Sequence, residues 1–78
     1  MSFLLYNIYK FKGDDFMKLK DIIIKYRSEK LLTQEQIALE IGVSIGTIIK
    51  IEKGEKASML VKAKIANYLN IDINEIED

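Results

Sequence analysis

Apolar residues recur at intervals of three and four along most of the chain, a spacing that gathers them on one face of an α-helix. The first such stretch begins at Lys18 and predicts a helix that ends near Lys30. Its apolar face would consist of Leu19, Ile22, Ile23, Tyr26 and Leu31. This helix is amphipathic, so it needs packing partners on one side only.

Two shorter helices follow, and capping residues mark their limits. Thr33 is a suitable N-cap for a helix from 34 to 41, and Gly42 can adopt the left-handed conformation that ends a helix. Ser44 can then cap a helix from 45 to 53. The positions of this pair that we expect to be buried are Ile37, Ala38, Ile41, Val43, Ile48 and Ile51.

The remaining pattern predicts two more helical elements. Ser58 would cap a fourth helix, and Asp72 would cap a last short turn or helix that contains Ile73 and Ile76. The apolar stripe of the fourth helix would be Leu60, Val61, Ile65, Ala66 and Leu69. We therefore expect an all-α domain of five helices with short connections.

Residues 1–16 differ from everything after them, because they hold five of the seven aromatic residues and favour a strand over a helix. Two interpretations compete. In the first, the segment is an added strand that pairs with its copy in a dimer or with a partner. In the second, translation begins at Met17 and the segment is not part of the natural protein. The second is open because residues 12–17 can be encoded by a purine-rich ribosome-binding sequence before a start codon. We divide the chain into an extension, 1–16, and a helical domain, 17–78.

The composition suits one small domain and excludes several kinds of chemistry. The chain has 78 residues, of which 49% are hydrophobic and 31% charged. It contains no cysteine and no histidine, so disulfides, thiolate and imidazole metal ligands and the commonest general base are excluded. We expect no enzyme activity, no cofactor and no metal site. The apolar run near the N-terminus is too short to span a membrane.

Net charge is zero, but the charges are unevenly distributed. Residues 17–56 hold 8 basic and 6 acidic residues, whereas residues 57–78 hold 2 basic and 4 acidic residues. A surface that binds nucleic acid would therefore have to be local and modest in charge.

The two short helices have the spacing of a DNA-binding helix-turn-helix. Ala38 is small enough for the second helix to cross close to the first, and Gly42 permits a positive φ at the corner. The concordant positions are Ile37, Ala38, Ile41, Gly42, Val43, Ile48 and Ile51. The alternative is an ordinary helical hairpin, which the same pattern would also allow.

Three segments, LTQEQIALEIGVS, KIEKGE and AKIANYLNIDINEI, resemble the Cro/C1-type (XRE-like) repressor family of five-helix, lambda-repressor-like domains. The resemblance covers Lys18 to Ile76. It implies a cytoplasmic, bacterial or phage-encoded regulator that binds double-stranded operator DNA as a homodimer. The helix from 45 to 53 would enter the major groove. The last helices would supply the dimer surface through Leu69, Ile71, Ile73 and Ile76, which the N-terminal extension could replace or reinforce.

The resemblance also implies roles for individual residues. Gln34 would contact a phosphate, and Arg27 would pair with Glu52. The positions implied to face DNA are Ser44, Ile45, Gly46, Thr47, Ile49 and Lys50. Elementary physics supports part of this, because helix N-termini bind phosphates and Gln34 lies at one. Lysines at the end of the third helix and in the loop after it could each neutralise a phosphate or simply face solvent. These are Lys50, Lys53 and Lys56.

The third helix departs from the family pattern, because Ile45, Gly46 and Ile49 stand where members usually carry arginine, glutamine or serine. Isoleucine cannot hydrogen-bond a base edge, although it can contact a thymine methyl. Three explanations fit. The domain binds A·T-rich DNA through methyl groups, phosphates and shape; the isoleucines bind another protein; or they are partly covered by the fold or a dimer.

Two functions follow from these alternatives. The first is a sequence-specific, repressor-like transcriptional regulator. The second is a protein-interaction module on a helix-turn-helix scaffold, for example an antitoxin-like or anti-repressor partner, with Ile45, Ile49 and the aromatic N-terminal segment as contact surfaces.

Overall fold

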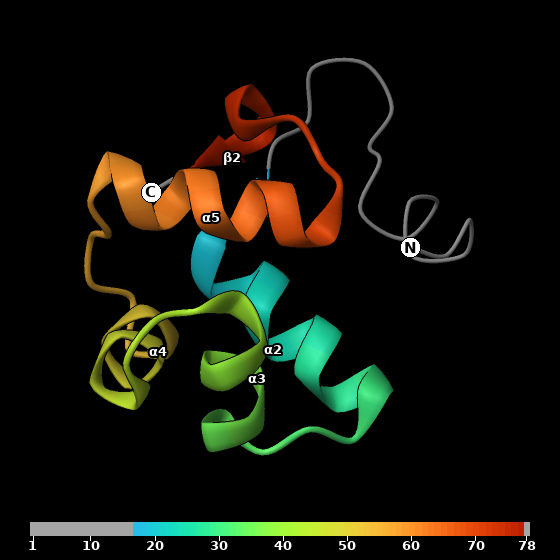
Figure 1. Ribbon diagram of the computed structural model, residues 1–78. Helices are drawn as coiled ribbons and strands as arrows, with labels where there is room; N and C mark the ends of the chain where they lie inside the picture. The colour runs from blue at the N-terminus through green and yellow to red at the C-terminus, as the bar shows by residue number, and fades with distance from the viewer. Residues whose placement is uncertain (1–16, 78) are drawn as a thin grey trace.

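The computed structural model describes residues 17–77, and within them the chain forms four α-helices and a two-stranded parallel sheet (Figure 1). The elements are β1 (Met17–Lys18), α2 (Leu19–Lys30), α3 (Gln34–Ile41), α4 (Ile45–Glu52), α5 (Met59–Leu69), the 3-10 helix η1 (Ile73–Glu75) and β2 (Ile76–Glu77). The extension expected at residues 1–16 lies outside the described residues. None of the helices in the described part has the length and apolar character needed to cross a membrane.

Side chains cap three of the α-helices as the sequence predicts. Thr33 and Gln36 form a capping box at the start of α3, in which each side chain bonds the other's backbone N–H. The Ser44 hydroxyl accepts from the backbone of α4, and the Ser58 hydroxyl accepts from the Val61 N–H of α5. These caps set where α3, α4 and α5 begin.

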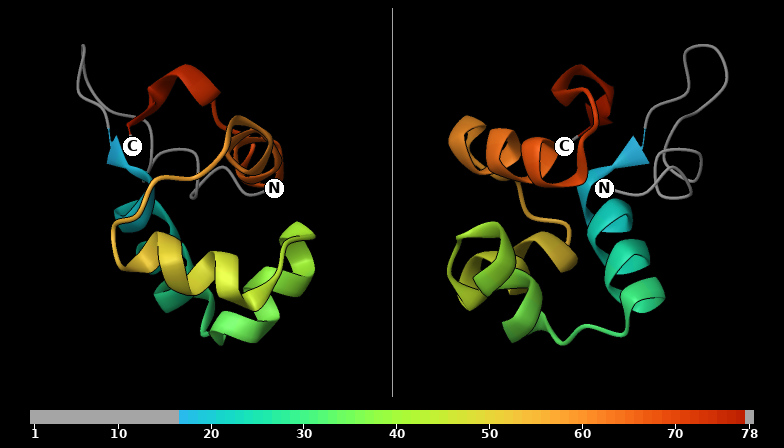
Figure 2. Two further views of the ribbon diagram at one scale, coloured as in Figure 1. Left: turned by 90° about the vertical axis from the view of Figure 1, so that its left-hand side faces the viewer. Right: turned by 45° about the vertical axis from the view of Figure 1, so that its right-hand side comes forward.

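The helices surround one hydrophobic core. α2 packs against α4, α3 packs against both α4 and α5, and α5 lies across the upper part of the molecule in the view of Figure 1 (Figures 1 and 2). The core consists of Leu19, Ile22, Ile23, Tyr26, Ile37, Ala38, Ile41, Ile48, Ile51, Ile65, Ala66, Leu69 and Ile76. Burial of the isoleucines from α3 and α4 holds this helix pair against the rest of the domain.

The expected count of five helices is wrong, because residues 17–77 contain four α-helices. The Asp72 carboxylate does cap the last segment by accepting from the Asn74 N–H, but only the single 3-10 turn of η1 follows. The chain then extends, and Ile76 pairs in parallel with Met17. Pairing of the two strands, rather than a fifth helix, places Ile76 in the core, where its side chain is 8% exposed.

Two leucines assigned to buried stripes are exposed. Leu31 is 88% exposed, because it adopts a left-handed conformation (φ 57°) that ends α2 and turns its side chain away from the apolar face. Leu60 is 67% exposed, and the neighbouring Val61 packs against the core in its place. Helix α4 also ends one residue earlier than expected, at Glu52, with Lys53 as its C-cap.

Candidate nucleic-acid interface

The corner between α3 and α4 is built around Gly42. Its φ of 92° is the left-handed conformation expected from the sequence. The N–H groups of Gly42 and Val43 both donate to the Ala38 carbonyl, at 2.9 and 3.0 Å. The chain can therefore leave α3, turn within three residues and start α4 at a fixed angle.

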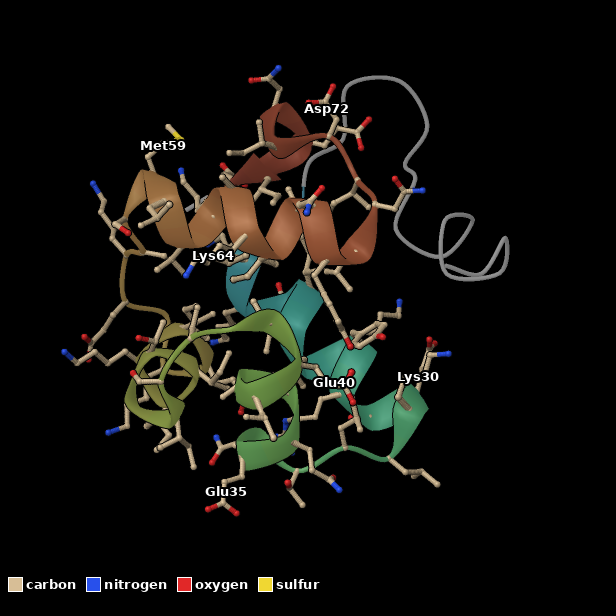
Figure 3. The ribbon with its side chains drawn as sticks, in the orientation of Figure 1. Lys30, Glu35, Glu40, Met59, Lys64 and Asp72 are labelled. Carbon is tan, nitrogen blue, oxygen red and sulfur yellow. The ribbon has the colours of Figure 1, made fainter. Side chains whose placement is uncertain are left out.

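Lys64, a residue of α5, fixes the same corner from outside. Its Nζ donates to the Gly42 carbonyl at 3.1 Å, and in Figure 3 the side chain points from α5 toward the α3–α4 pair. The interaction satisfies a carbonyl at the end of α3 with a cation, which the helix dipole favours. No local pattern in the sequence marks this pair, because Lys64 lies 22 residues from Gly42.

Packing of α4 leaves one of its faces toward solvent. Ile48 and Ile51 are 0% and 2% exposed and anchor the helix in the core. On the other side Ile45 is 42% exposed. The remaining residues implied to face DNA are Ser44, Gly46 and Lys50, which are exposed, and Thr47 and Ile49, which are half-buried. The outer face of α4 is therefore not covered by the rest of residues 17–77, although the fold partly covers Ile49.

The two hydroxyl groups on this face bond each other. Ser44 Oγ accepts from the Thr47 N–H at 3.1 Å and lies 2.9 Å from Thr47 Oγ1. Ser44 is thus the N-cap of α4 as well as a residue of its outer face. Both hydroxyls are held in place before any ligand binds.

Gly46 is not required by packing within the domain. A Cβ at this position would meet only Ser44 Oγ, at 3.8 Å, which is an ordinary van der Waals distance. Glycine destabilises a helix interior by about 1 kcal/mol relative to alanine. Glycine at position 46 leaves the surface of α4 beside Ile45 without a side chain. No contact in the described part of the chain requires this glycine.

A three-residue cluster ties α2, α3 and α4 together at the end of α4. Arg27 Nε and a terminal guanidinium nitrogen donate to the two Glu52 oxygens, at 2.8 and 3.1 Å. Gln34 Nε2 donates to Glu52 at 2.9 Å, and Arg27 also donates to the Leu32 carbonyl at 3.2 Å. The Glu52 side chain is 10% exposed and that of Arg27 28%.

The cluster changes the expectation for Gln34. One N–H of its carboxamide donates to Glu52, which fixes the side chain at the N-terminus of α3, and a second N–H remains on the same nitrogen. The family resemblance implies a phosphate contact for Gln34 and a pair between Arg27 and Glu52. It does not indicate that Glu52 accepts from both residues, because contacts between three helices leave no local signal.

Lysines lie along the C-terminal end of α4 and beyond it. Lys50, Lys53 and Lys56 are all exposed. Lys50 and Lys56 line a cleft of about 200 Å³ between α4 and the start of α5, together with Thr47, Ser58 and Val61. The basic side chains are therefore grouped beside the outer face of α4, where they can neutralise an anionic backbone that lies along it.

A second polar cluster joins the other helices. Tyr68 of α5 donates to the Glu40 carboxylate of α3, and its hydroxyl lies 3.0 Å from that of Tyr26 in α2. The two rings meet edge to face, with their centroids 5.5 Å apart. Burial, the hydrogen bond to Glu40 and contact with Tyr26 together raise the pKa of Tyr68 above its ordinary value.

Comparison with known proteins agrees with this geometry. A family model described as Helix-turn-helix matches residues 23–76. The chain is also 41% identical over 59 residues to an uncharacterised HTH-type transcriptional regulator of Methanocaldococcus jannaschii, a match that covers 74% of this chain and 89% of that protein.

Proposed function

Because the chain belongs to the helix-turn-helix family, we propose that it regulates transcription by binding operator DNA as a homodimer. The observation that carries the proposal is the uncovered outer face of α4, with Ile45 42% exposed next to a group of exposed lysines. The resemblance to a protein named as an HTH-type transcriptional regulator supports the same function.

In the proposed complex α4 lies in the major groove and the N-terminus of α3 approaches the phosphate backbone. Lys50, Lys53 and Lys56 neutralise phosphates beside the groove. The Arg27–Glu52–Gln34 cluster does not contact bases. It fixes α4 relative to α3, so that the backbone contacts and the groove contacts are made together.

The proposed mode of action is repression by occupancy. A dimer bound at a promoter excludes the transcription machinery, and the concentration of the protein sets how much of the promoter is occupied. We propose no enzymatic step, because the chain has neither histidine nor cysteine.

Selection of bound duplexes from a random oligonucleotide pool tests the proposal. Enrichment of two half-sites related by two-fold symmetry, about 34–36 Å or a multiple apart, is expected for a dimer. Two chains per duplex should be found by light scattering. Binding should weaken steeply between low and moderate salt. A pool that shows no enrichment, or binding that does not change with salt, would overturn the proposal.

Exposed apolar side chains favour a second candidate, a protein-interaction module. Ile45 is 42% exposed, and Met59 and Leu60 are each 67% exposed. Such side chains can bind another protein. Under this alternative, Ile45→Ala and Ile49→Ala abolish a protein complex and leave DNA binding unchanged. Under the proposed function, both substitutions weaken operator binding.

A further inference from the structure

The outer face of α4 offers few groups that can hydrogen-bond a base edge. The Ser44 and Thr47 hydroxyls lie 2.9 Å apart and bond each other, and Ser44 also accepts from the helix backbone. Gly46 has no side chain. Lys50 is the one long polar side chain among the residues of α4 implied to face DNA, and its position at the last turn of α4 suits a phosphate as well as a base.

Apolar surface takes the place of hydrogen-bonding groups on this face. Ile45 is 42% exposed. The next residue is Gly46, which has no side chain, so the Ile45 side chain extends further from the helix than its neighbour does. Ile49 lies four residues on, so the two side chains share one face about 6 Å apart along the helix axis. That separation is close to two base steps, which are about 3.4 Å each along one strand.

One feature of the major groove is apolar. Thymine presents a C5-methyl group there beside its O4 acceptor, whereas adenine, guanine and cytosine present only hydrogen-bond donors and acceptors. Cytosine methylated at C5 carries the same methyl group at the same ring position. A side chain that recognises only the methyl group therefore distinguishes a methylated pyrimidine from an unmethylated one.

From these observations we infer that α4 recognises the C5-methyl groups of pyrimidines, chiefly through Ile45 and in part through Ile49. The ligand is duplex DNA that carries thymine, or 5-methylcytosine, at the positions facing Ile45. The inference rests on the proposed function, since α4 must lie in the major groove, and it specifies which chemical feature of the bases is recognised.

The test removes single methyl groups from the DNA. In the duplex found by the selection above, each thymine is replaced in turn by deoxyuridine, which keeps the hydrogen-bonding pattern and lacks only the methyl. One or two positions in each half-site should lose affinity by about fourfold each, the effect of one methyl-sized apolar contact. At those positions 5-methylcytosine should bind more tightly than cytosine.

The protein variant Ile45→Ala completes a double-mutant cycle with the deoxyuridine duplex. This variant should bind the thymine and deoxyuridine duplexes equally at the position that faces residue 45. A matched control, Lys53→Gln, should weaken both duplexes by the same factor, because it removes a charge and no methyl contact. Thermal unfolding of Ile45→Ala establishes that the variant folds, and its exposed position predicts little change in stability.

The outcomes separate this inference from the proposed function. Tight, salt-dependent binding that is equal for thymine and deoxyuridine at every position would overturn methyl recognition and leave the regulator intact. A methyl effect that persists unchanged in both Ile45→Ala and Ile49→Ala would also overturn it. A failure to bind any duplex would overturn the proposed function and the inference together.

Discussion

Arg27 Nε lies 2.8 Å from Glu52 Oε2, a contact across 25 residues of sequence that joins the last turn of α2 to the last residue of α4. The two planar groups meet through two hydrogen bonds, which fixes their relative orientation as well as their distance. Gln34 completes the set from α3. Three helices thus meet at one carboxylate that is 10% exposed.

Removal of this carboxylate should destabilise the domain more than removal of the whole pair. Glu52→Ala leaves the Arg27 guanidinium and the Gln34 amide without their acceptor, and we expect a loss of about 1–3 kcal/mol in the free energy of unfolding. The double variant Arg27→Met with Glu52→Leu should lose less than Glu52→Ala alone, because it leaves no charged group without its partner. Urea unfolding measures both; a double variant that loses as much stability as Glu52→Ala, or more, would contradict this prediction.

Gly42 at the corner and Gly46 within α4 should respond to alanine substitution with opposite changes in stability. Gly42→Ala places a Cβ on a residue with φ 92°, and should cost about 1–2 kcal/mol in the free energy of unfolding. Gly46→Ala meets no close atom and should stabilise the helix by up to about 1 kcal/mol. Thermal unfolding distinguishes them, and a stabilising Gly42→Ala would contradict the role of the left-handed corner.

Lysines beside α4 should contribute to the salt dependence of DNA binding. Lys53→Gln and Lys56→Gln should each lower the slope of log affinity against log salt concentration by about 0.9, the value for one lost phosphate contact. Lys30→Gln is the matched control, since Lys30 is exposed at the end of α2 and lies on the other side of the molecule from α4 (Figure 3). An equal change in Lys30→Gln would mean that overall charge, rather than contact, sets the slope.

The tyrosine cluster should make stability depend on pH in the alkaline range. The pKa of Tyr68 is raised above its ordinary value of 10.0, chiefly by burial and by the hydrogen bond to Glu40. The protonated hydroxyl is therefore favoured in the folded state, and its contribution is complete below pH 10.0 and is lost as the pH rises above that value.

Tyr68→Phe tests this dependence. The variant should be less stable than the natural protein at neutral pH, by about 0.5–1.5 kcal/mol for the lost hydrogen bonding. This difference in the free energy of unfolding should shrink as the pH rises above about 10, because only the natural protein must ionise a hydroxyl at this position. Parallel pH profiles for the two proteins would show that Tyr68 titrates as it does in the unfolded chain.

Local signals predicted the limits of the helices and most of the core. The caps at Thr33, Ser44 and Ser58 depend on hydrogen bonds within three residues, so they can be found in the sequence alone. The buried positions of α3 and α4 follow from helical periodicity, and the left-handed Gly42 follows from its lack of a Cβ. Each of these features is decided by neighbours along the chain.

Contacts between distant segments could not be predicted in the same way. The strands β1 and β2 have two residues each, too few for any periodicity, and their pairing joins Met17 to Ile76 across the whole domain. Leu31 fits the apolar spacing of α2, but its left-handed backbone turns it toward solvent. In the candidate site, the contacts of Gln34 with Glu52 and of Lys64 with Gly42 depend on how separate helices pack.

The parallel pairing of Met17 with Ile76 has a practical consequence for engineering. It brings the two ends of the described part of the chain to one edge. Fluorescent proteins or affinity tags fused directly at Met17 or at Glu77 would leave from that same edge. The same proximity makes the domain a candidate for circular permutation, with a short linker joining the two strands and new ends opened in the loop between α4 and α5.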